Sequence, residues 1–553
     1  MARHHVEWNI ISLAGPLEPS GGARPVRNRW RVFVIAFVCF FAANLLWSLA
    51  SPLRSSPDEP AHFIRAAAVV RGDLTGQPKA GETWLSESLV PKYIADTQGR
   101  TCYAYQPDVS ASCDGPVDPD DTPTPAVTTA NSNHPLFYAI TGLPTLVLDG
   151  NAALYGMRGM SALLNAAMLA IATMSLWQFP RARFALMGLV AGFTPMVAFL
   201  SGTLNPNGVE VTAAVALISV LLLTLRRASS TRLLWERGAM VVLATLLLSS
   251  TRSISLLWVL VIVVAALLAA DWRSAKDLFR RPAAIVTVVV SGLVAVGAMA
   301  WFLTPLTTYG DGGQTYPEVG TGYWTGFLQM LVSTFDYAQG WIGLFGWIDT
   351  ALPLSAMAIW TVAAGSLVAA AFIVGRGRAL LAPLLLVLVL VFVPAFVQAA
   401  LVTEMGYIWQ GRYTLAMFAV LLVLCGVVID GSDVVLGVRT TRRLVTIALG
   451  ALVIAHLIAF VNTLRRYTVG SQYSFADMLQ HVTWQPPAGW LPLSVAYLVV
   501  LTTGAVLLRR RLLNDHDAPV GSVAQTPGRR SEDPLGPAAK LIGDGTANRR
   551  AST

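Results

Sequence analysis

Residues 379–401 read ALLAPLLLVLVLVFVPAFVQAAL and contain no Asp, Glu, Lys or Arg. A helix needs about 20 predominantly apolar residues to cross the hydrocarbon core of a bilayer, so this stretch can span a membrane. It lacks the apolar/polar alternation that a strand of a membrane barrel requires. Eleven further stretches have the same character: 32–50, 153–177, 183–203, 207–225, 236–250, 252–270, 283–305, 351–374, 412–430, 444–462 and 490–508. The sequence therefore predicts an all-α polytopic membrane protein with about 12 transmembrane helices.

The composition excludes several classes of protein. Of the 553 residues, 54% are hydrophobic and 13% are charged, whereas a soluble globular chain carries roughly 25% charged residues. These figures rule out a soluble enzyme and an intrinsically disordered protein. The formal charge of +8, from 39 Lys and Arg against 31 Asp and Glu, would suit a nucleic-acid binder, but the basic residues cluster beside the apolar stretches instead. We expect the bilayer as a partner, and no nucleic acid.

The positions of the basic residues predict the orientation in the membrane, because cytoplasmic loops carry an excess of Lys and Arg. Arg24, Arg27, Arg29 and Arg31 precede the first span and place the N-terminus in the cytoplasm. The other basic clusters share that side only if the short, proline-containing stretch 134–148 lies on the outer surface without crossing. These clusters are Arg226, Arg227, Arg232 and Arg237; Arg273, Lys276, Arg280 and Arg281; Arg376 and Arg378; Arg439, Arg442 and Arg443; and Arg509 to Arg511. We expect a multi-pass protein of the plasma membrane with both termini in the cytoplasm.

Two long segments are expected on the extracytoplasmic side. Segment 51–152 forms a large first outer loop in which acidic residues outnumber basic ones, and 306–350 forms a second loop without Lys or Arg. The expected organisation is a cytoplasmic segment over 1–31, a membrane domain over 32–508 and a disordered cytoplasmic tail over 509–553. The tail is rich in Gly, Pro, Ser and Arg, a composition that does not support a packed core.

The four cysteines fall into two groups. Cys39 and Cys425 lie inside expected spans, where a thiol is an ordinary packing group. Cys102 and Cys113 lie close together in the first outer loop, and an oxidising exterior favours a disulfide between them. The alternative is two free thiols. No His or further Cys near them has the spacing of a metal site, so no metal is assigned there.

Two adjacent carboxylates follow the first span in the motif Pro57-Asp58-Glu59-Pro60-Ala61-His62-Phe63. A carboxylate at the membrane boundary is well placed as a general base, because partial desolvation raises its proton affinity. Asp58 and Glu59 are therefore the candidate catalytic residues. The alternative is structural, with Asp58 as the N-cap of the helix that carries His62. The pair could also help to bind a divalent cation, although two carboxylates alone do not define a metal site.

Five arginines at the expected outer boundary are candidate ligands for a phosphate. An arginine in hydrocarbon is costly and is expected to pair with a carboxylate or a phosphate, to which its guanidinium offers a bidentate fork. Two of the five follow the eleventh span and break the positive-inside pattern, although they could also snorkel to the interface. The five are Arg158, Arg252, Arg412, Arg465 and Arg466. With Asp58 they provide a base and phosphate-binding groups for attack on a sugar carbon whose leaving group is a lipid phosphate.

Further polar and aromatic residues on this side are candidate substrate contacts: His62, His134, Asp349, Gln410 and Tyr413. His134 precedes a proline and could instead start a helix. The aromatic residues around Asp349 could instead form an interfacial belt. Gly411 permits a close approach of the backbone. The aromatic residues of the second outer loop could cover a sugar, and they are Tyr309, Tyr316, Tyr323, Trp324 and Trp341.

Three short motifs, in this order, resemble those of the bacterial membrane-protein family catalogued as domain of unknown function 2142. They are Pro57-Asp58-Glu59-Pro60-Ala61-His62-Phe63, Gly346-Trp347-Ile348-Asp349-Thr350 and Gln410-Gly411-Arg412-Tyr413, and the resemblance covers about residues 30–508. It implies a relation to the membrane-embedded glycosyltransferases of the GT-C class, which have a large first outer loop and use polyprenyl-phosphate or polyprenyl-diphosphate sugars. In that class a carboxylate of the first outer loop acts as base or positioning group. This role carries over to Asp58, with Glu59 as the less favoured candidate.

We therefore expect a GT-C-like, inverting membrane glycosyltransferase. It would move a sugar from a polyprenyl-phosphate donor to an envelope glycan, glycolipid or protein on the extracytoplasmic face. A transporter or flippase of lipid-linked sugars is the first alternative, but it needs a polar path into the cytoplasmic half, and 379–401 and 412–430 are almost wholly apolar. A non-catalytic scaffold for envelope assembly is the second, and it needs the carboxylate pair only as a helix cap. No cofactor is assigned, and a divalent cation stays open.

Overall fold

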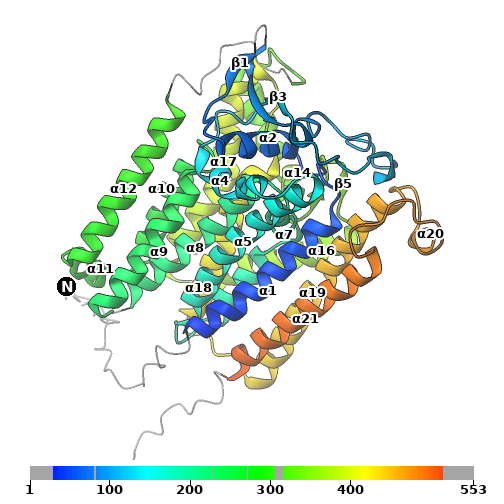
Figure 1. Cartoon of the computed structure of the whole chain (residues 1–553). Helices are drawn as coiled ribbons and strands as arrows, with labels where there is room; N and C mark the ends of the chain where they lie inside the picture. Colours follow the sequence, from blue (N-terminus) through cyan, green and yellow to red (C-terminus); the bar gives the residue numbers. More distant parts are fainter. Residues whose placement is uncertain (1–28, 80–81, 228, 271, 305–315, 515–553) are drawn as a thin grey trace, which may run out of the picture.

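The computed structural model describes residues 29–514 except 80–81, 228, 271 and 305–315. Figure 1 shows a bundle of long helices with a cap of short helices and strands, including α2, α4, β1 and β3, at one end. The segment before Arg29, the tail after Asn514 and Tyr309 lie outside the described residues, so the expectations for them stay predictions.

Among the described residues, nine helices are long and apolar enough to cross a membrane, and a bent pair raises the number to ten. The nine are α1 (Arg29–Ala50), α5 (Gly150–Trp177), α8 (Pro206–Arg226), α12 (Pro282–Phe302), α16 (Leu354–Val374), α17 (Leu381–Met405), α18 (Leu415–Asp430), α19 (Val438–Thr468) and α21 (Trp490–Asn514). Two of them, α17 and α18, are counted with the 3-10 turns before them, η4 (Gly377–Leu380) and η5 (Gly411–Thr414). The chain is an all-α polytopic membrane protein.

The expected span 183–203 is broken in the middle. It forms α6 (Arg183–Gly192) and α7 (Pro195–Gly202), which meet at 59°. Pro195 explains the break, because proline has no N–H to donate and disfavours helix at the residue before it. The hydroxyl of Thr194 accepts a hydrogen bond from the Val197 N–H at 3.3 Å and caps α7.

The two remaining expected spans are also helical, but each falls short of an ideal span. The first turns of α9 (Thr231–Ser249) carry Arg232, Glu236 and Arg237, and α10 (Ser255–Leu268) has 14 residues. Every stretch that the sequence predicts to span the membrane therefore contains a helix. The number that meets the full length and hydropathy requirement is smaller because of one break, one charged end and one short helix.

The centre of the bundle is formed by α8 and α18, each with 89% of its apolar window buried, whereas α12, α16 and α21 are only 11–17% buried. Small residues allow α6 and α18 to pack backbone to backbone. A Cβ at Gly188 would lie 2.2 Å from the Leu422 carbonyl oxygen, and one at Gly426 would lie 2.1 Å from that of Phe184. Such contacts are how membrane helices approach each other without a hydrophobic driving force.

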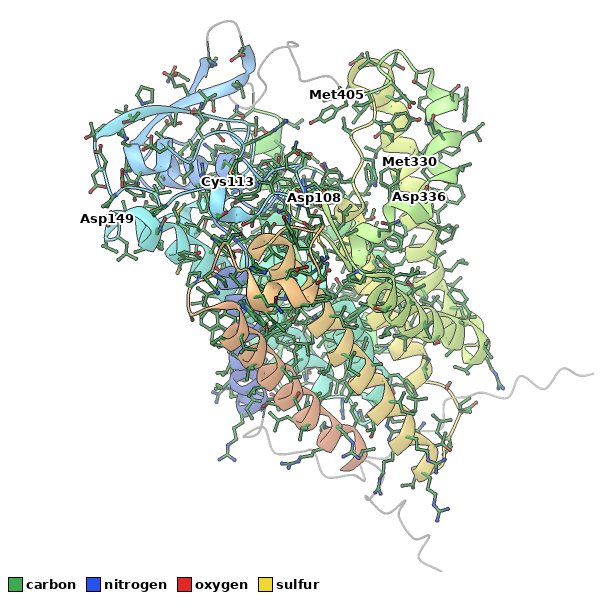
Figure 2. The ribbon with its side chains drawn as sticks, turned by 90° about the vertical axis from the view of Figure 1, so that its right-hand side faces the viewer. Asp108, Cys113, Asp149, Met330, Asp336 and Met405 are labelled. Atoms are coloured by element: carbon green, nitrogen blue, oxygen red, sulfur yellow. A yellow bond between two sulfur atoms is a disulfide. The ribbon has the colours of Figure 1, made fainter. Side chains whose placement is uncertain are left out.

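The first outer loop folds into a cap on the bundle, which Figure 2 shows with Cys113, Asp108 and Asp149 labelled. Its strands form an antiparallel sheet in the order β1-β2-β3. The elements are α2 (Glu59–Val69), β1 (Gln77–Lys79), β2 (Glu82–Pro91), α3 (Lys92–Ala95), η2 (Ala111–Cys113), β3 (Pro123–Thr128), α4 (Pro135–Thr141) and η3 (Leu143–Leu146). The stretch 134–148 thus forms two helices of seven and four residues, which pack on α2 and α5 and are too short to cross a membrane.

The later outer segments complete this end of the molecule. The described part of the expected second outer loop, 306–350, folds into three short helices and a hairpin before α16 begins. These are α13 (Tyr323–Val332), α14 (Thr334–Tyr337), α15 (Gln339–Ile342) and the hairpin of β4 (Leu344–Phe345) and β5 (Thr350–Ala351). Helix α13 packs on α17, and Figure 2 shows Met330 and Met405 on this column beside the cap. Two further short helices are α11 (Trp272–Leu278) and α20 (Phe475–Gln480).

Candidate functional site

Asp58 stands at the start of α2 in an unusual backbone conformation. It occupies the N-cap position with φ +64°, in the left-handed region, and its side chain makes no cap hydrogen bond. Asp tolerates this region better than most residues, but such geometry still costs free energy and persists only where the surroundings impose it. The carboxylate is 54% exposed and points at another group. The capping interpretation of Asp58 is therefore wrong.

That other group is the guanidinium of Arg412. Its Nη2 donates to Asp58 Oδ2 at 2.9 Å, although the two residues come from the first outer loop and from η5. The Arg412 side chain is 5% exposed. Within the described part of the chain, its buried Nε and Nη1 make no hydrogen bond of good geometry, although the Tyr413 hydroxyl lies close enough to interact with the guanidinium. A buried charged group with unused donors is costly, so this arrangement favours an anionic ligand that would accept from them.

Gly411 is what lets η5 take this position. A Cβ at residue 411 would lie 1.9 Å from the Tyr337 carbonyl oxygen, so any other residue would push η5 off α14 and α15. The contact is reinforced by Trp341, whose indole N–H donates to the Thr414 hydroxyl at 3.0 Å. The close approach expected of Gly411 is therefore an approach to protein backbone, and it fixes the residue next to it, Arg412.

Two arginine side chains lie near the aromatic ring of Tyr413. The guanidinium carbon of Arg252 lies 3.9 Å from the ring centroid and that of Arg412 lies 5.6 Å from it. Arg252 also donates to Asn207 Oδ1 at 3.3 Å, which anchors it to the start of α8. Arg252 also interacts electrostatically with the buried Glu210 of α8, so the two arginines lie between two carboxyl groups, Asp58 and Glu210. The structure therefore brings together Asp58, Arg412, Arg252 and Tyr413 of the expected set.

His62 lies one turn after Asp58 and is buried. Its Nδ1 lies 2.9 Å from the Tyr138 hydroxyl, which itself accepts from the Asn133 side-chain amide at 2.8 Å. The tyrosine oxygen can donate its own proton to Nδ1 or accept a second hydrogen bond from it, so either ring nitrogen of His62 can carry the imidazole hydrogen. Burial lowers the pKa of His62 to about 4, with Asp58 opposing the shift and Arg412 adding to it. The imidazole is neutral at pH 7.

Glu59 and Arg158 lie in the interior instead of the site. Neither side chain has exposed surface, and Arg158 Nη2 lies 2.6 Å from Glu59 Oε2. The guanidinium of Arg158 also donates hydrogen bonds to Glu59 Oε1 and to the carbonyl oxygens of Ser48, Ser51 and Pro52. We therefore correct two assignments: Glu59 cannot act as a base, and Arg158 cannot reach a donor phosphate, from these positions. The pair instead holds the start of α2 against the end of α1.

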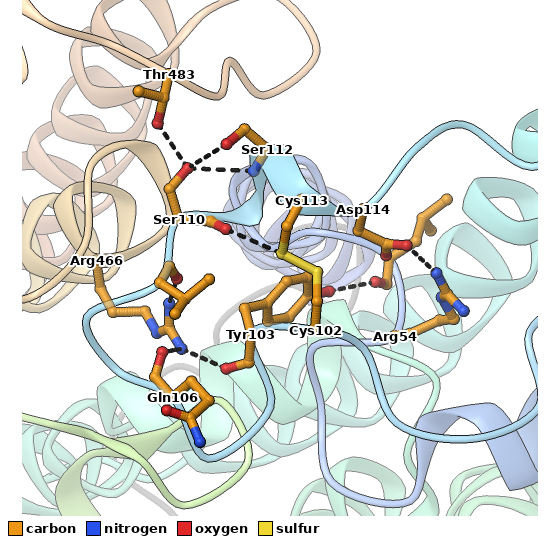
Figure 3. Close-up of a disulfide and its surroundings, with 12 residues drawn as sticks. Arg54, Cys102, Tyr103, Gln106, Ser110, Ser112, Cys113, Asp114, Arg466 and Thr483 are labelled. Carbon is orange, nitrogen blue, oxygen red and sulfur yellow. Dashed lines mark hydrogen bonds and ion pairs between the residues drawn. A yellow bond between two sulfur atoms is a disulfide. The ribbon is translucent and has the colours of Figure 1, made fainter.

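Asp349 and Arg466 are likewise structural. They pair at 3.2 Å with exposed fractions of 6% and 0%. Arg466 also donates to the carbonyls of Tyr103, Gln106 and Val109, and so holds the loop closed by the Cys102–Cys113 disulfide (Figure 3). Asp349 accepts from the Tyr105 N–H at 3.0 Å. Both side chains are buried and committed to each other and to this loop, so the assignments of Arg466 to the phosphate and Asp349 to the substrate are replaced by a role in anchoring it.

The three other expected residues are Arg465, His134 and Gln410. Arg465 donates to the carbonyl of Ser471 and lies 5.1 Å from the ring of Phe475, beside α20. His134 caps α4 by accepting from the Leu136 N–H at 3.2 Å, which is the structural alternative weighed for it, and burial lowers its pKa. Arg465 thus binds backbone near α20 and His134 has a capping role. The Gln410 Oε1 is buried without a hydrogen-bond partner among the described residues, and its contact with a substrate stays a prediction.

Two groups were missed in the sequence. Tyr138 lies in the stretch 134–148, and no local signal in the sequence marks it as a partner of His62. Glu210 lies within the apolar run of α8, is fully buried and accepts from the Ser255 hydroxyl at 2.5 Å. An acidic residue inside a span is a strong signal of function and could have been found. It lies one helical turn after Asn207, the ligand of Arg252.

The site also bears on the open question of a divalent cation. Asp58 and Glu59 do not converge, because Glu59 is turned inward to Arg158. Among the residues that the structure describes, no group of three or more His, Cys, Asp or Glu side chains is placed to hold a metal ion. The carboxylate pair thus does not fit a metal site, and the positive charge at Asp58 comes from Arg412 and Arg252.

Comparison with known proteins gives one family and a small set of solved structures, two of which illustrate the likeness. The family model described as "Predicted membrane protein (DUF2142)" matches residues 40–423. These two are crystal structures of ArnT from Cupriavidus metallidurans, one bound to undecaprenyl phosphate and one in the apo state. They are 15% and 14% identical to this chain with TM-scores of 0.41 and 0.39, and each match covers 88% of this chain and 78% of that one. No curated protein matches the chain.

Proposed function

The chain belongs to the DUF2142 family of membrane proteins, and we propose that this member is a membrane-embedded glycosyltransferase. Its donor is a polyprenyl-phosphate sugar and its acceptor a cell-envelope glycan, glycolipid or protein on the extracytoplasmic face. One observation carries the proposal. The buried guanidinium of Arg412 holds the exposed carboxylate of Asp58 at 2.9 Å and keeps two further nitrogens without a hydrogen bond of good geometry among the described residues.

This geometry supplies the two charges that glycosyl transfer from a lipid phosphate needs. Asp58 accepts the proton of the acceptor hydroxyl, whose oxygen forms a bond to the anomeric carbon of the donor sugar. The bond from that carbon to the phosphate oxygen breaks, and its electron pair leaves with the lipid phosphate. Arg412 and Arg252 stabilise the charge that develops there, so the leaving group needs no general acid. Attack opposite the phosphate inverts the anomeric centre.

The neighbouring residues position the reactants. Tyr413 holds both guanidinium groups within 6 Å of its ring and so keeps them near one point. His62 presents a neutral imidazole near Asp58, and its Nε2 can hydrogen-bond a sugar hydroxyl as donor or acceptor. Tyr316, in the second outer loop, lies close enough to Asp58 and Arg412 for both charges to affect its pKa, which burial raises. An aromatic ring there offers a stacking face for the sugar.

The alternatives draw less support. A scaffold needs Asp58 as a cap, and its side chain makes no cap hydrogen bond. A flippase needs a polar path through the cytoplasmic half, yet α18 at the centre of the bundle is a continuous apolar helix with 89% of its window buried. A scaffold does not explain why a buried arginine keeps unused donors next to an exposed carboxylate, and a flippase, which would use the same arginines for the phosphate, does not need the carboxylate.

The test separates binding from chemistry. Purified protein is mixed with a short-chain polyprenyl-phosphate sugar, and affinity is measured for wild type, Arg412→Ala and Asp58→Asn. Loss of charged hydrogen bonds weakens binding by about 10–100-fold in Arg412→Ala. Asp58→Asn retains the donor and loses transfer to a cell-envelope fraction. Arg465→Ala and Asp118→Asn are matched controls, since Arg465 lies beside α20 and Asp118 is exposed in the cap. Full transfer by Asp58→Asn, or donor affinity unchanged in Arg412→Ala, refutes the proposal.

A further inference from the structure

The half of the bundle away from the cap carries an apolar groove between α1, α5, α6, α19 and α21. Its volume is about 410 Å³, and its walls include Ala36, Phe40, Leu189, Leu452 and Gly504. The two helices at its rim, α1 and α21, have only 22% and 17% of their apolar windows buried, so the groove opens toward lipid. Its size falls in the range of ligand-binding cavities, and its lining suits a hydrocarbon chain.

Basic side chains stand at one end of the groove. Arg31 lines it directly, and Arg511 lies with its guanidinium carbon 4.9 Å from the ring centroid of Trp177, another lining residue. Figure 1 shows the start of α1 and the end of α21 close together, at the end of the bundle opposite β1 and β3. Cations placed where an apolar groove ends match the layout of a phospholipid, whose phosphate joins the acyl chains at the membrane surface.

The groove has the length of one leaflet. Along α1 it extends from Arg31 to Ala43, which at 1.5 Å per residue is about 18 Å. Half of a bilayer's hydrocarbon core is about 15 Å thick. From Arg31 to Ala50, the end of α1 that leads to Asp58, the helix rises about 28 Å, close to the whole core. A lipid phosphate at Arg31 therefore belongs to the leaflet opposite the one that faces Asp58 and Arg412.

We propose that this groove binds one anionic glycerophospholipid of the leaflet opposite Asp58. One acyl chain lies between α1 and α21, and the phosphate meets Arg31 and Arg511. The sugar donor is a different lipid, because its phosphate must reach Arg412 on the other face. The bound chain fills the space beside α21, which packs chiefly on α1 and α19, and so fixes the last helix to the bundle.

Gly504 offers a clean way to block the groove. A Cβ there meets no atom within 4 Å, so Gly504→Leu places its side chain in the groove without a clash. Gly365 of α16 is a matched control, since it too has open space around it and does not line the groove. Delipidated full-length protein is incubated with phosphatidylglycerol, and bound lipid is counted by native mass spectrometry. Wild type and Gly365→Leu retain one lipid tightly, and Gly504→Leu loses it.

The head-group end is tested separately. Each basic side chain near a membrane surface contributes about a fivefold factor in affinity for anionic lipid, so Arg31→Gln with Arg511→Gln weakens binding by about thirtyfold. Arg376→Gln, which removes an exposed arginine away from the groove, leaves the affinity unchanged. Three results overturn the proposal: phosphatidylcholine binding as tightly as phosphatidylglycerol, retention of the lipid by Gly504→Leu, or displacement of phosphatidylglycerol by a short polyprenyl monophosphate.

Discussion

Glu59 and Arg158 form an ion pair in which both side chains are fully buried and Arg158 Nη2 lies 2.6 Å from Glu59 Oε2. The residue before Glu59 is Asp58, whose carboxylate is 54% exposed and faces Arg412. Two consecutive carboxylates therefore stand in opposite environments. Glu59 also accepts from the Leu204 N–H at 2.9 Å, so it ties α2 to the turn before α8. This anchored residue explains how Asp58 is held in a left-handed backbone conformation at the surface.

The first prediction is that neutralising Glu59 lowers the stability of the fold more than neutralising Asp58 does. Glu59→Gln removes one partner of a buried pair and leaves Arg158 charged in the interior, which destabilises a fold by about 3–5 kcal/mol. Asp58→Asn, the same chemical change one residue earlier, also removes the partner of a buried arginine, but it should cost less because the Asp58 carboxylate is half exposed and water screens its pair with Arg412. Thermal unfolding of both variants in the same detergent measures the difference. Equal melting temperatures for the two would show that Glu59 does not anchor α2.

The second prediction concerns the ring of Tyr413. Arg252 lies 3.9 Å from its centroid, and a cation over an aromatic face gains about 0.5–2 kcal/mol. Tyr413→Phe keeps the ring and should bind a polyprenyl-phosphate sugar as wild type does. Tyr413→Leu releases Arg252 and should weaken donor binding by about 2–30-fold. Titration calorimetry distinguishes the two. If Phe and Leu weaken binding equally, the hydroxyl and not the ring is what matters.

The sequence predicted the membrane helices well because a span must be apolar along its whole length, a local property that any window reveals. It also singled out Asp58 and Arg412, which stand in short motifs at the expected membrane boundary and lie 2.9 Å apart in the structure, although their roles stay predictions. It could not rank the arginines, because Arg158 and Arg412 look alike in a sequence. What separates them is tertiary: Arg158 uses its donors on Glu59 and on backbone carbonyls, whereas Arg412 keeps two nitrogens unused among the described residues.

The same reason explains why the partners of His62 were missed. Tyr138 meets His62 only because α4 packs across α2, and that packing depends on the whole cap. The break within 183–203 could have been predicted, since Pro195 follows a threonine that can cap a helix. The position that α7 takes near the site could not be predicted, because it depends on the packing of α7 against α1, α8 and α15.

The third prediction uses the titration of His62. Its pKa in the folded protein is about 4, below the value of about 6.5 of an exposed histidine. The unfolded chain therefore takes up the proton first as the pH falls. The stability that His62 contributes is present above about pH 6.5 and is lost toward pH 4, by up to about 3 kcal/mol.

The measurement is a difference between variants, since carboxylates also titrate in this range. His62→Gln removes the histidine's contribution, so the melting temperature of wild type should fall more steeply than that of His62→Gln between pH 7 and 4.5. His134→Gln, at a half-buried histidine of the cap, controls for a general effect of removing an imidazole. Parallel curves for wild type and His62→Gln would mean that His62 is not held neutral by its surroundings.

The fourth prediction concerns what holds the loop beside the site. The Cys102–Cys113 disulfide closes a loop with a sequence separation of 11, for which chain entropy gives about 3 kcal/mol. Arg466 binds the same loop from inside, through the carbonyls of Tyr103 at 2.8 Å and Gln106 at 3.0 Å. Because these buried charged hydrogen bonds persist without the disulfide, reduction alone should leave the loop docked.

Hydrogen–deuterium exchange over residues 103–109 tests whether Arg466 holds this loop more firmly than the Cys102–Cys113 disulfide does. Reduction should raise exchange modestly, whereas Arg466→Met should expose the segment fully, because it also leaves Asp349 buried without its cation. Arg465→Met is the matched control and should raise exchange less, since the adjacent arginine bonds to the carbonyls of Ser471 and Tyr473 and meets this loop only indirectly, through the Ser471 N–H that donates to the Pro107 carbonyl. If reduction alone exposes residues 103–109 as much as Arg466→Met does, the disulfide and not the arginine is the main tie. The loop would then depend on the oxidising exterior.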